Sequence, residues 1–300
     1  GGAAAAAPEM AARRWVPQSQ SGFTRDRDAP EATLVLSLHR EAAAARRKGS
    51  YRGFCDFATF FESVCRDVQR VVEREARVRP SVSAVVFAIQ EATRRRYDLG
   101  EGLTPGVDCF SGLGQGDPDS PVRSKLVLAV MQHAVSAMCN GATFDAPYAA
   151  HEAAVGQVFF ADDGAYLSDS HAGLQLMFDV AWTVARMEGL TIGVNSKGTK
   201  TAWSGGEWQQ LANGGWEWQR CGRERQILLG DGTEVPYVDS YKHLGSAFTA
   251  EVGHATVRNR IADRCRALLA MLARLGVLSA EQFERASRAV VDSLIGYYGR

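Results

Sequence analysis

The sequence predicts an α+β fold, in which a small sheet of short apolar strands is covered by amphipathic helices. Two observations predict it. Short apolar runs alternate with segments of helical spacing, and two of these runs, near residues 52–58 and 157–161, carry or lead into aspartates. The composition, with 46% hydrophobic and 23% charged among 300 residues, indicates a folded chain that can bury one large core or two modest ones.

Several segments repeat apolar residues every three or four positions, as amphipathic helices do. The first of them opens at Pro30 and ends with cations before Gly49, and both signals are typical of helix boundaries. Helices are expected over residues 30–48, 62–77, 81–97, 124–138 and 174–187, and two more over 252–275 and 280–297.

Shorter apolar runs predict strands. Two of them flank Asp162, Asp163 and Gly164, which predicts a β-hairpin with acids at its turn. The stretch 205–232, rich in Gly, Trp and Gln, is consistent with an extended hairpin or an insertion. Strands are expected over residues 52–58, 157–161, 165–167, 191–194 and 241–247.

The sequence argues against several classes of protein. It holds no run of eighteen apolar residues, and the Gly/Ala stretch 1–7 is unlike a secretory signal, so we expect a soluble, intracellular protein without a membrane partner. Neither nucleus nor cytoplasm is indicated, and no oligomeric state is predicted. The six cysteines form no CxxC pair, which argues against a disulfide framework or a zinc cluster.

Lysine plus arginine balance aspartate plus glutamate at 34 each, whereas phosphate-binding proteins usually carry a basic excess. The charge is uneven, however. The first 48 residues hold eight basic against five acidic side chains, and the residues from 252 onward hold eight arginines against four acids. Basic ends around an acidic middle suit a protein that grips a nucleic-acid backbone and concentrates metal ions at its centre.

Acidic residues at two strand ends are the candidate chemistry. Enzymes that join nucleotides use two Mg²⁺ ions about 3.5–4 Å apart, and Mg²⁺ prefers hard oxygen ligands. Asp56 sits on one short apolar strand, and Asp162 and Asp163 end another. Each signal alone is open to a plainer reading, a helix cap for Asp56 and solvated turn acids for the pair. On adjacent strands of one sheet the three carboxylates would meet.

Between these acids lies a glycine-rich turn, residues 112–121, that leads into a helix. Glycines allow a ligand to approach the backbone closely, and the amide of Gln115 can donate to a base or sugar. A flexible loop before a proline-started helix is the alternative reading of the same residues.

Taken in order, these pieces resemble the reverse transcriptases, and among them those of non-LTR (LINE-type) retrotransposons. The resemblance covers residues 20 to about 275. Each motif alone is only moderately specific for the family, but together they are highly specific. The segments that carry it are 20–27 (similar to Q-x-G-F-R-x-x-R), 56–64 (D-F-S-K-A-F-D-S-V), 112–121 (G-V-P-Q-G-D-P-L-S-P), 160–163 (F/Y-A-D-D), 189–197 (G-L-x-I-N-x-x-K-T), 241–245 (Y-L-G) and 260–272 (R-I-x-x-A).

The resemblance implies a right-hand polymerase palm over residues 51–250. A disordered tail would occupy 1–19, a remnant of the fingers 20–50, and the start of a helical thumb 251–300. It implies a nucleotidyltransferase, an RNA-directed DNA polymerase that takes an RNA template, a DNA primer and dNTPs. Its cofactor would be two Mg²⁺ ions, with Mn²⁺ as a possible substitute.

The resemblance also implies a role for individual residues. Phe61 falls at the aromatic position that blocks a ribonucleotide 2′-hydroxyl, and either Lys197 or Lys200 would assist the triphosphate. The metal-holding catalytic residues would be Asp56, Asp162 and Asp163. The nucleotide and template contacts would be Phe57, Phe61, Gln115, Gly116 and Lys197. The primer and duplex contacts would be Tyr241, Leu244, Gly245 and Arg258.

The sequence also departs from the family's pattern. Gly114 replaces a proline, and Asp119, Arg123 and Lys125 stand where the family prefers apolar residues and Asn. Basic fingers strands are not recognisable before Gln20, and endonuclease and RNase H parts are absent. Two alternatives therefore remain open. One is a viral RNA-dependent RNA polymerase, disfavoured by Phe61 and by the alanine before the acid pair. The other is a decayed or domesticated element that binds nucleic acid without polymerising.

Overall fold

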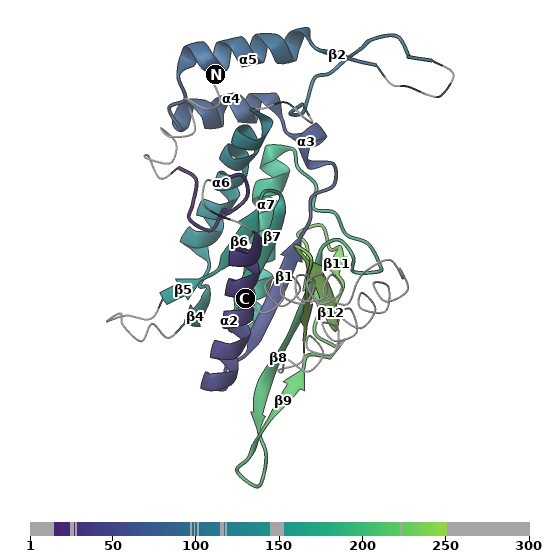
Figure 1. Cartoon of the computed structure of the whole chain (residues 1–300). Helices are drawn as coiled ribbons and strands as arrows, with labels where there is room; N and C mark the ends of the chain where they lie inside the picture. The colour runs from purple at the N-terminus through teal and green to yellow at the C-terminus, as the bar shows by residue number, and fades with distance from the viewer. Residues whose placement is uncertain are drawn as a thin grey trace, which may run out of the picture.

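The computed structural model describes residues 15–24, 27, 29–96, 98, 100, 102–114, 117, 119–144, 153–222 and 224–250. Its centre is an antiparallel sheet of five strands in the order β6-β7-β1-β8-β9. The predicted α+β class is confirmed in this form (Figure 1). The strands are β1 (Ser50–Cys55), β6 (Gln157–Phe160), β7 (Asp163–Ser168), β8 (Ala202–Gln210) and β9 (Trp216–Arg220).

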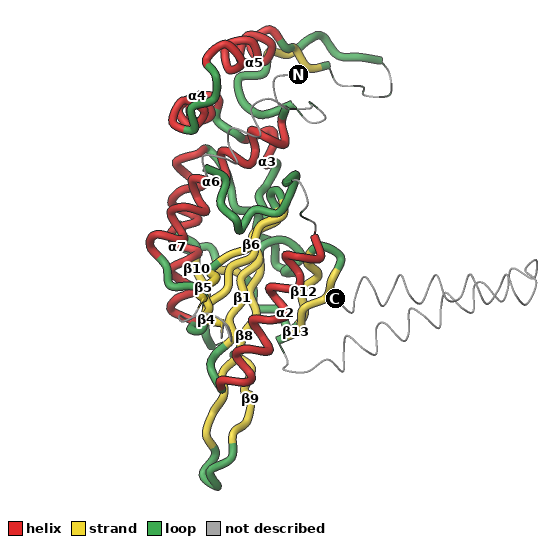
Figure 2. The backbone as a smooth tube through the Cα atoms, turned by 60° about the vertical axis from the view of Figure 1, so that its left-hand side comes forward, coloured by secondary structure: helices red, strands yellow, loops and turns green. Residues whose placement is uncertain are grey.

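Helices cover both faces of this sheet. On one face α7 (His171–Glu188) packs against β1 and β7 and against α6 (Ser120–Met138), while on the other α2 (Ala29–Arg46) packs against β1 and β6. Figure 2 shows α2 and α7 on opposite sides of the strands. Strand β1 is buried along its whole length because successive side chains point to opposite faces. Residues 29–46, expected within a fingers remnant, therefore lie directly on the sheet.

Strand β1 shows how closely these layers approach. Tyr51 and Cys55 belong to the core on the α7 side, whereas Phe54 belongs to the core on the α2 side. Between them, Gly53 leaves room for α7, since a Cβ there would lie 2.5 Å from the ring of Phe178. A side chain at position 53 would therefore push α7 away from the sheet.

The helix expected over 62–77 is interrupted, which corrects the prediction. It forms α3 (Phe60–Ser63) and α4 (Arg66–Glu75), separated by two extended residues, Val64 and Cys65. The Val64 carbonyl accepts from Gly112, and the Cys65 N–H donates to Glu188, so both groups bond outside the helix. Helix α4 packs on α6 and on α5 (Pro80–Ala92) and is not one of the helices that back the sheet.

The remaining strands form short hairpins. The extended hairpin considered for 205–232 is present as β8–β9, where Trp208 and Trp218 pair across the strands with ring centroids 5.7 Å apart. Residues 191–194, expected as a strand, make only isolated bridges from Ile192 and Val194. The two-stranded pairs are β2 (Arg94–Arg95) with β3 (Val107–Asp108), β4 (Ala142–Phe144) with β5 (Ala153–Val155), β10 (Ile227–Leu228) with β11 (Glu234–Val235), and β12 (Ser240–His243) with β13 (Ser246–Thr249).

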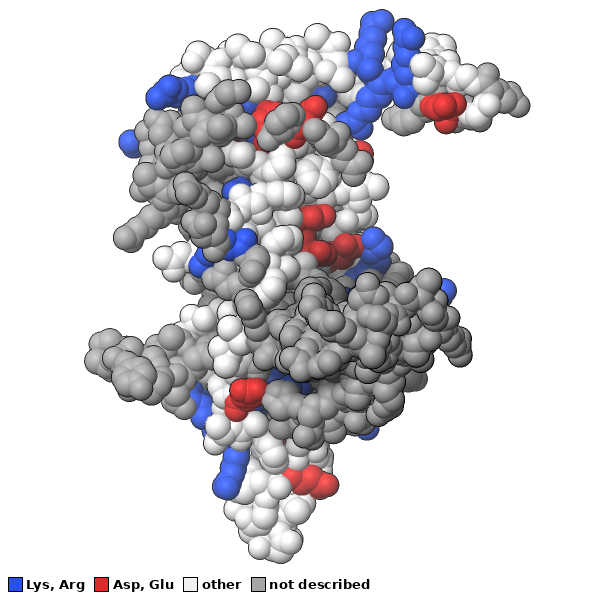
Figure 3. Space-filling model, in the orientation of Figure 1, with Lys and Arg blue, Asp and Glu red and all other residues white. Residues whose placement is uncertain are grey.

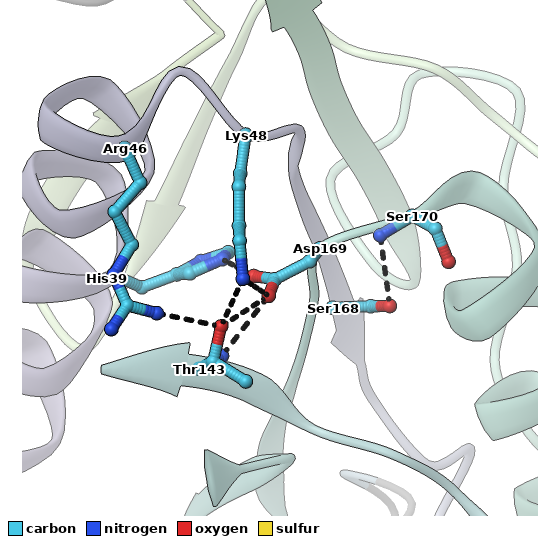
Figure 4. A network of polar contacts seen from close by, with 7 residues as sticks. All are labelled: His39, Arg46, Lys48, Thr143, Ser168, Asp169 and Ser170. Atoms are coloured by element: carbon cyan, nitrogen blue, oxygen red, sulfur yellow. Dashed lines mark hydrogen bonds and ion pairs between the residues drawn. The ribbon is translucent and has the colours of Figure 1, made fainter. Parts of the chain in front are cut away.

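A polar network fastens α2 to the sheet (Figure 4). Arg46 and Lys48 each donate to the Thr143 hydroxyl over 3.0 Å, and this hydroxyl donates to Asp169 over 2.6 Å. His39, fully buried, lies 3.7 Å from the other Asp169 oxygen. Burial lowers the pKa of His39, even though the nearby Asp169 carboxylate opposes that shift. The network joins the end of α2 to β4 and to the residue after β7.

The first described residues pack against the helices. His133 on α6 lies against the ring of Trp15 and bonds its carbonyl over 2.7 Å. Residues 15–19 are thus part of the packed structure rather than of the expected disordered tail, and residues 1–14 lie outside the described ranges, as does the thumb expected over 251–300. None of the described helices is long and apolar enough to cross a membrane.

Candidate active site

The sheet register brings the predicted acids to one end of neighbouring strands. Cys55 pairs with Gly164 across β1 and β7, and Phe160 pairs with Asp163 across β6 and β7. Asp56 follows Cys55 and Asp163 precedes Gly164, so these two residues leave the ladder at the same end. Asp162 lies in the two-residue turn between β6 and β7. Figure 3 shows acidic side chains grouped over this end of the sheet, with basic side chains beside them.

The backbone of Asp56 is held on both sides. Its N–H donates to the Thr201 hydroxyl over 3.1 Å, and its carbonyl accepts from that hydroxyl and, over 2.8 Å, from the Gly193 N–H. Thr201 is fully buried. A Cβ at Gly193 would lie 3.4 Å from the Asp56 carboxylate, an ordinary van der Waals contact, so the Gly193 backbone runs directly beside this carboxylate. These contacts fix the position of the Asp56 backbone, from which its carboxylate extends.

A lysine completes the electrostatics of the site. Lys200 Nζ lies 2.9 Å from Asp56 Oδ2, and this contact raises the pKa of Lys200. Loss of water raises the pKa of Asp163 to about 6, and the charges of Asp162 and Asp56 add to the shift while Lys200 opposes it. The pKa of Asp162 is raised in the same way, first by burial and then by Asp56. The four groups therefore form one electrostatic unit.

The glycine-rich turn docks on α3 beside Phe61. Gly112 donates to Val64 over 2.8 Å and Leu113 donates to Phe61 over 2.6 Å. Gly112 has φ +90, and a Cβ there would meet the Phe61 carbonyl at 2.8 Å, so both the conformation and the space require glycine. Phe61 is partly buried and meets Phe60 edge to face. Gln115 and Gly116, predicted beside the nucleotide, lie outside the described residues.

A cavity of about 430 Å³ opens next to this turn. It is bounded by the glycine-rich turn, by α3 and α5, and by the β2–β3 ribbon. Its polar lining residues are Glu62, Arg66, Gln90, Thr93, Arg95 and Asp117.

Phe57 was predicted as a nucleotide contact, but its ring is only 3% exposed and belongs to the core beside Phe60. Its backbone bridges to Ile192 and so helps to place the segment that carries Gly193. The predicted contact is corrected on this evidence, because a ring in the core has no free face for a nucleotide.

The β12–β13 hairpin reaches the site through Tyr241. The ring of Tyr241 stacks on Phe54 with centroids 4.1 Å apart, and its hydroxyl donates to the Lys200 carbonyl. Burial, and then the charges of Asp56 and Asp163, raise the pKa of Tyr241. Leu244 and Gly245, at φ 48 and φ 83, form the two-residue turn of this hairpin. Arg258, predicted to contact duplex phosphates, lies outside the described residues.

Sequence reasoning left two lysines open for the triphosphate and did not identify Thr201. Lys197 and Lys200 are both exposed, and it is Lys200 that reaches Asp56. A local sequence signal could have identified Lys200, because the Asn195 side chain accepts from the Thr199 N–H over 3.1 Å and shapes the turn that precedes Lys200. Thr201 gave no signal, since it lies 145 positions from the backbone it holds.

The three carboxylates lie close enough to affect one another's ionisation, but they are not preassembled as a cage. Within the described ranges, no three histidine, cysteine or acidic side chains could hold a metal ion as they stand.

Comparison with known proteins shows structural similarity only at a distant level. No family model matches the sequence, and no curated protein matches it. Among solved structures, telomerase from Candida tropicalis, in complex with the TWJ fragment of telomeric RNA, is similar with 8% identity and a TM-score of 0.48. The alignment covers 98% of this chain and 44% of that one, so this chain spans less than half of that protein's length. The function is therefore argued from the geometry of the site.

Proposed function

We propose that this chain is the palm of a template-directed polymerase that adds dNTPs to a primer 3′-end while copying RNA. One observation carries the proposal. Asp56, Asp162 and Asp163 come from distant parts of the sequence and gather at one end of adjacent antiparallel strands, with Lys200 against them. Rigid strands that present carboxylates to one point are the arrangement that metal-assisted phosphoryl transfer needs.

The chemistry of the donor set would suit a pair of Mg²⁺ ions. All three side chains offer hard oxygen ligands, and Asp56 Oδ2 is a buried oxygen whose contact in the described structure is the Lys200 ammonium, a cation that a metal ion could replace. The raised pKa of Asp163 reflects negative charge that a cation would relieve. Bound ions would supply charge neutralisation for the attacking hydroxyl and the leaving pyrophosphate. Asp56, Asp162 and Asp163 would hold them, and Lys200 would leave the Asp56 carboxylate.

The residues around the acids suit a nucleotide and a primer. Phe61 lies beside the glycine-rich turn, where an aromatic ring would exclude a 2′-hydroxyl from a bound sugar. On the other side, the Tyr241 hydroxyl donates to the carbonyl of Lys200, whose ammonium group contacts Asp56, so the β12–β13 hairpin would hold the primer end against the acids. Phe61 favours DNA synthesis over the RNA polymerase alternative.

Primer extension on poly(rA)/oligo(dT) with Mg²⁺ or Mn²⁺ tests the proposal. The chain should extend the primer, and Asp162→Asn should lower the rate by at least about 100-fold, since it removes a ligand charge without removing bulk. Asp239→Asn is the matched control, because this side chain is 69% exposed and pairs only with Arg220 among the ion pairs described.

Extension that survives Asp162→Asn would refute the mechanism. A folded chain that extends no primer, yet binds RNA, would instead assign it to non-catalytic nucleic-acid binding.

A further inference from the structure

The segment of residues 19–22 runs alongside the outer edge of β6. The Ser21 N–H donates to the Phe159 carbonyl and the Phe159 N–H donates to the Ser19 carbonyl, each over 2.7 Å. Gln20 and Phe159 form a parallel bridge between these two bonds. Figure 1 shows the start of the described chain beside β6. This segment therefore lies next to the turn that presents Asp162.

The Gln20 side chain holds the peptide groups of that turn. Its Oε1 accepts from the Ala161 N–H over 3.0 Å, and its Nε2 donates to the Ala161 carbonyl over 3.1 Å. The same oxygen accepts from the Gly22 N–H over 3.0 Å. Gln20 is 1% exposed, so water does not compete for these bonds. One carboxamide thus binds both polar backbone groups of the residue before Asp162.

Ala161 needs such support. Its φ is 59, a left-handed conformation that is unfavourable for an alanine and persists only where the surrounding structure enforces it. The next two residues carry like charges that repel each other and Asp56. Without a restraint, the turn would relax its backbone and its carboxylates would move apart.

Gly22 supports the same conclusion independently. A Cβ at this position would lie 2.0 Å from the Ala161 nitrogen and 2.8 Å from its Cα. Any larger residue would lift the segment from the turn and break the Gln20 contacts. The segment and the turn are therefore built to touch at one residue.

We infer that Gln20 is a positioning residue, which fixes the Ala161 peptide and thereby the direction of the Asp162 and Asp163 carboxylates. The inference rests on the proposed function of these carboxylates. Gln20 itself touches no reacting atom. A group that orients metal ligands from behind typically changes metal affinity by about 10–100-fold when it is lost.

Two substitutions of similar volume separate positioning from plain stability. Gln20→Met removes all the side-chain hydrogen bonds to the turn. Gln157→Met is the control, because Gln157 is a buried glutamine on β6 whose bonds run to Gln132 and Ser136 on α6. Gln20→Asn keeps a carboxamide one methylene too short to reach both Ala161 groups, and it tests the same contact if the methionine variant does not fold.

Two readouts apply to the full chain. Amide hydrogen exchange at Ala161 should be faster in the Gln20 variants and unchanged in Gln157→Met. Mn²⁺ titration followed by electron paramagnetic resonance gives the affinity of the carboxylates for Mn²⁺. Binding that remains in the Asp162→Asn variant is subtracted. This affinity should fall by about 10-fold in the Gln20 variants. In Gln157→Met it should stay within about two-fold, even where the melting temperature falls equally.

Unchanged Mn²⁺ affinity in the Gln20 variants would overturn the positioning role and leave the proposed function standing. An equal loss of affinity in Gln157→Met would also overturn it, because the affinity would then follow stability. No Asp162-dependent Mn²⁺ binding in the unchanged chain would remove the proposed function and the role of Gln20 together.

Discussion

Lys200 Nζ lies 2.9 Å from Asp56 Oδ2, and the lysine side chain is 52% exposed. The cation therefore contacts the carboxylate from the solvent side. The Lys200 carbonyl accepts from the Tyr241 hydroxyl, so the backbone of Lys200 is held while its ammonium group faces solvent. An exposed cation on an anchored backbone suits a group that would pair with a bound triphosphate once metal ions occupy the acids.

Replacing Lys200 should slow nucleotide addition, whereas replacing Lys197 should not. Lys200→Met removes the cation beside the acids. We expect the single-turnover rate of nucleotide incorporation to fall by at least about 10-fold, because the loss of a positioned charge or proton donor typically has an effect of this size. Lys197→Met is the matched control and should stay within about two-fold. Equal effects of the two substitutions would contradict the assignment of Lys200.

Tyr241→Phe tests the bond from the β12–β13 hairpin to Lys200. The ring would still stack on Phe54, but the hydrogen bond to the Lys200 carbonyl would be lost. We expect a loss of stability of about 1 kcal/mol, measured by urea unfolding, and a lower incorporation rate at saturating dNTP. The rate should recover little with more primer. Full recovery at high primer concentration would place the role of the hydroxyl in primer binding alone.

Phe61→Ala should relax the choice between dNTPs and NTPs. If the ring excludes the 2′-hydroxyl, its removal should raise NTP incorporation relative to dNTP incorporation by about 10-fold or more, measured as the ratio of kcat/KM values. Phe110→Ala is a suitable control, since Phe110 is 86% exposed and lies two residues before Gly112. A ratio that does not change would remove Phe61 as the sugar gate.

Glu188 should make the free energy of unfolding depend on pH. It is 2% exposed, its carboxylate oxygens have no hydrogen-bond partner among the described residues, and burial raises its pKa to about 8. The folded protein thus holds this proton more tightly than the unfolded chain does. The contribution of protonated Glu188 to the free energy of unfolding is fully present below pH 4.5, the ordinary pKa of a glutamate. It is lost as the pH rises through about 8, the pKa in the folded protein.

Glu188→Gln should therefore match the unchanged chain near pH 4.5 and be more stable at pH 8.5, by an amount on the order of a few kcal/mol. Urea unfolding at both pH values measures the difference. Glu75→Gln, at a side chain 57% exposed, is the control and should show no such change. A Glu188→Gln advantage that is equal at both pH values would point to repacking rather than to ionisation.

The sequence predicted the parts of the site whose signals are local. A short apolar run beside an acid can be recognised within a few residues. For this reason Asp56 and the Asp162–Asp163 hairpin could be placed on neighbouring strands. The helix break at Val64 was not predicted, because its cause is bonding to Gly112 and Glu188, far along the chain. Helical periodicity continues through the break and conceals it.

The supporting residues were harder to predict, for a related reason. Thr201 and Gln20 act through hydrogen bonds to the backbone of residues more than a hundred positions away, and neither residue type has a periodicity that would reveal such a partner. Phe57 shows the converse. Its place in a motif suggested a nucleotide contact, while its burial among Phe60 and other core side chains decides against one.

The two edges of the five-stranded sheet differ in their exposure to other chains. No further strand pairs with β9 in the part of the chain that is described, but β9 is largely exposed and carries Glu217 and Arg220, charges that discourage edge-to-edge pairing. The edge of β6 is apolar and is shielded by residues 19–22. Loss of that segment, by truncation or by proteolysis, would uncover a row of unpaired backbone groups beside Val158 and Phe159. Aggregation of the protein would then begin at the strand that leads into the turn with Asp162.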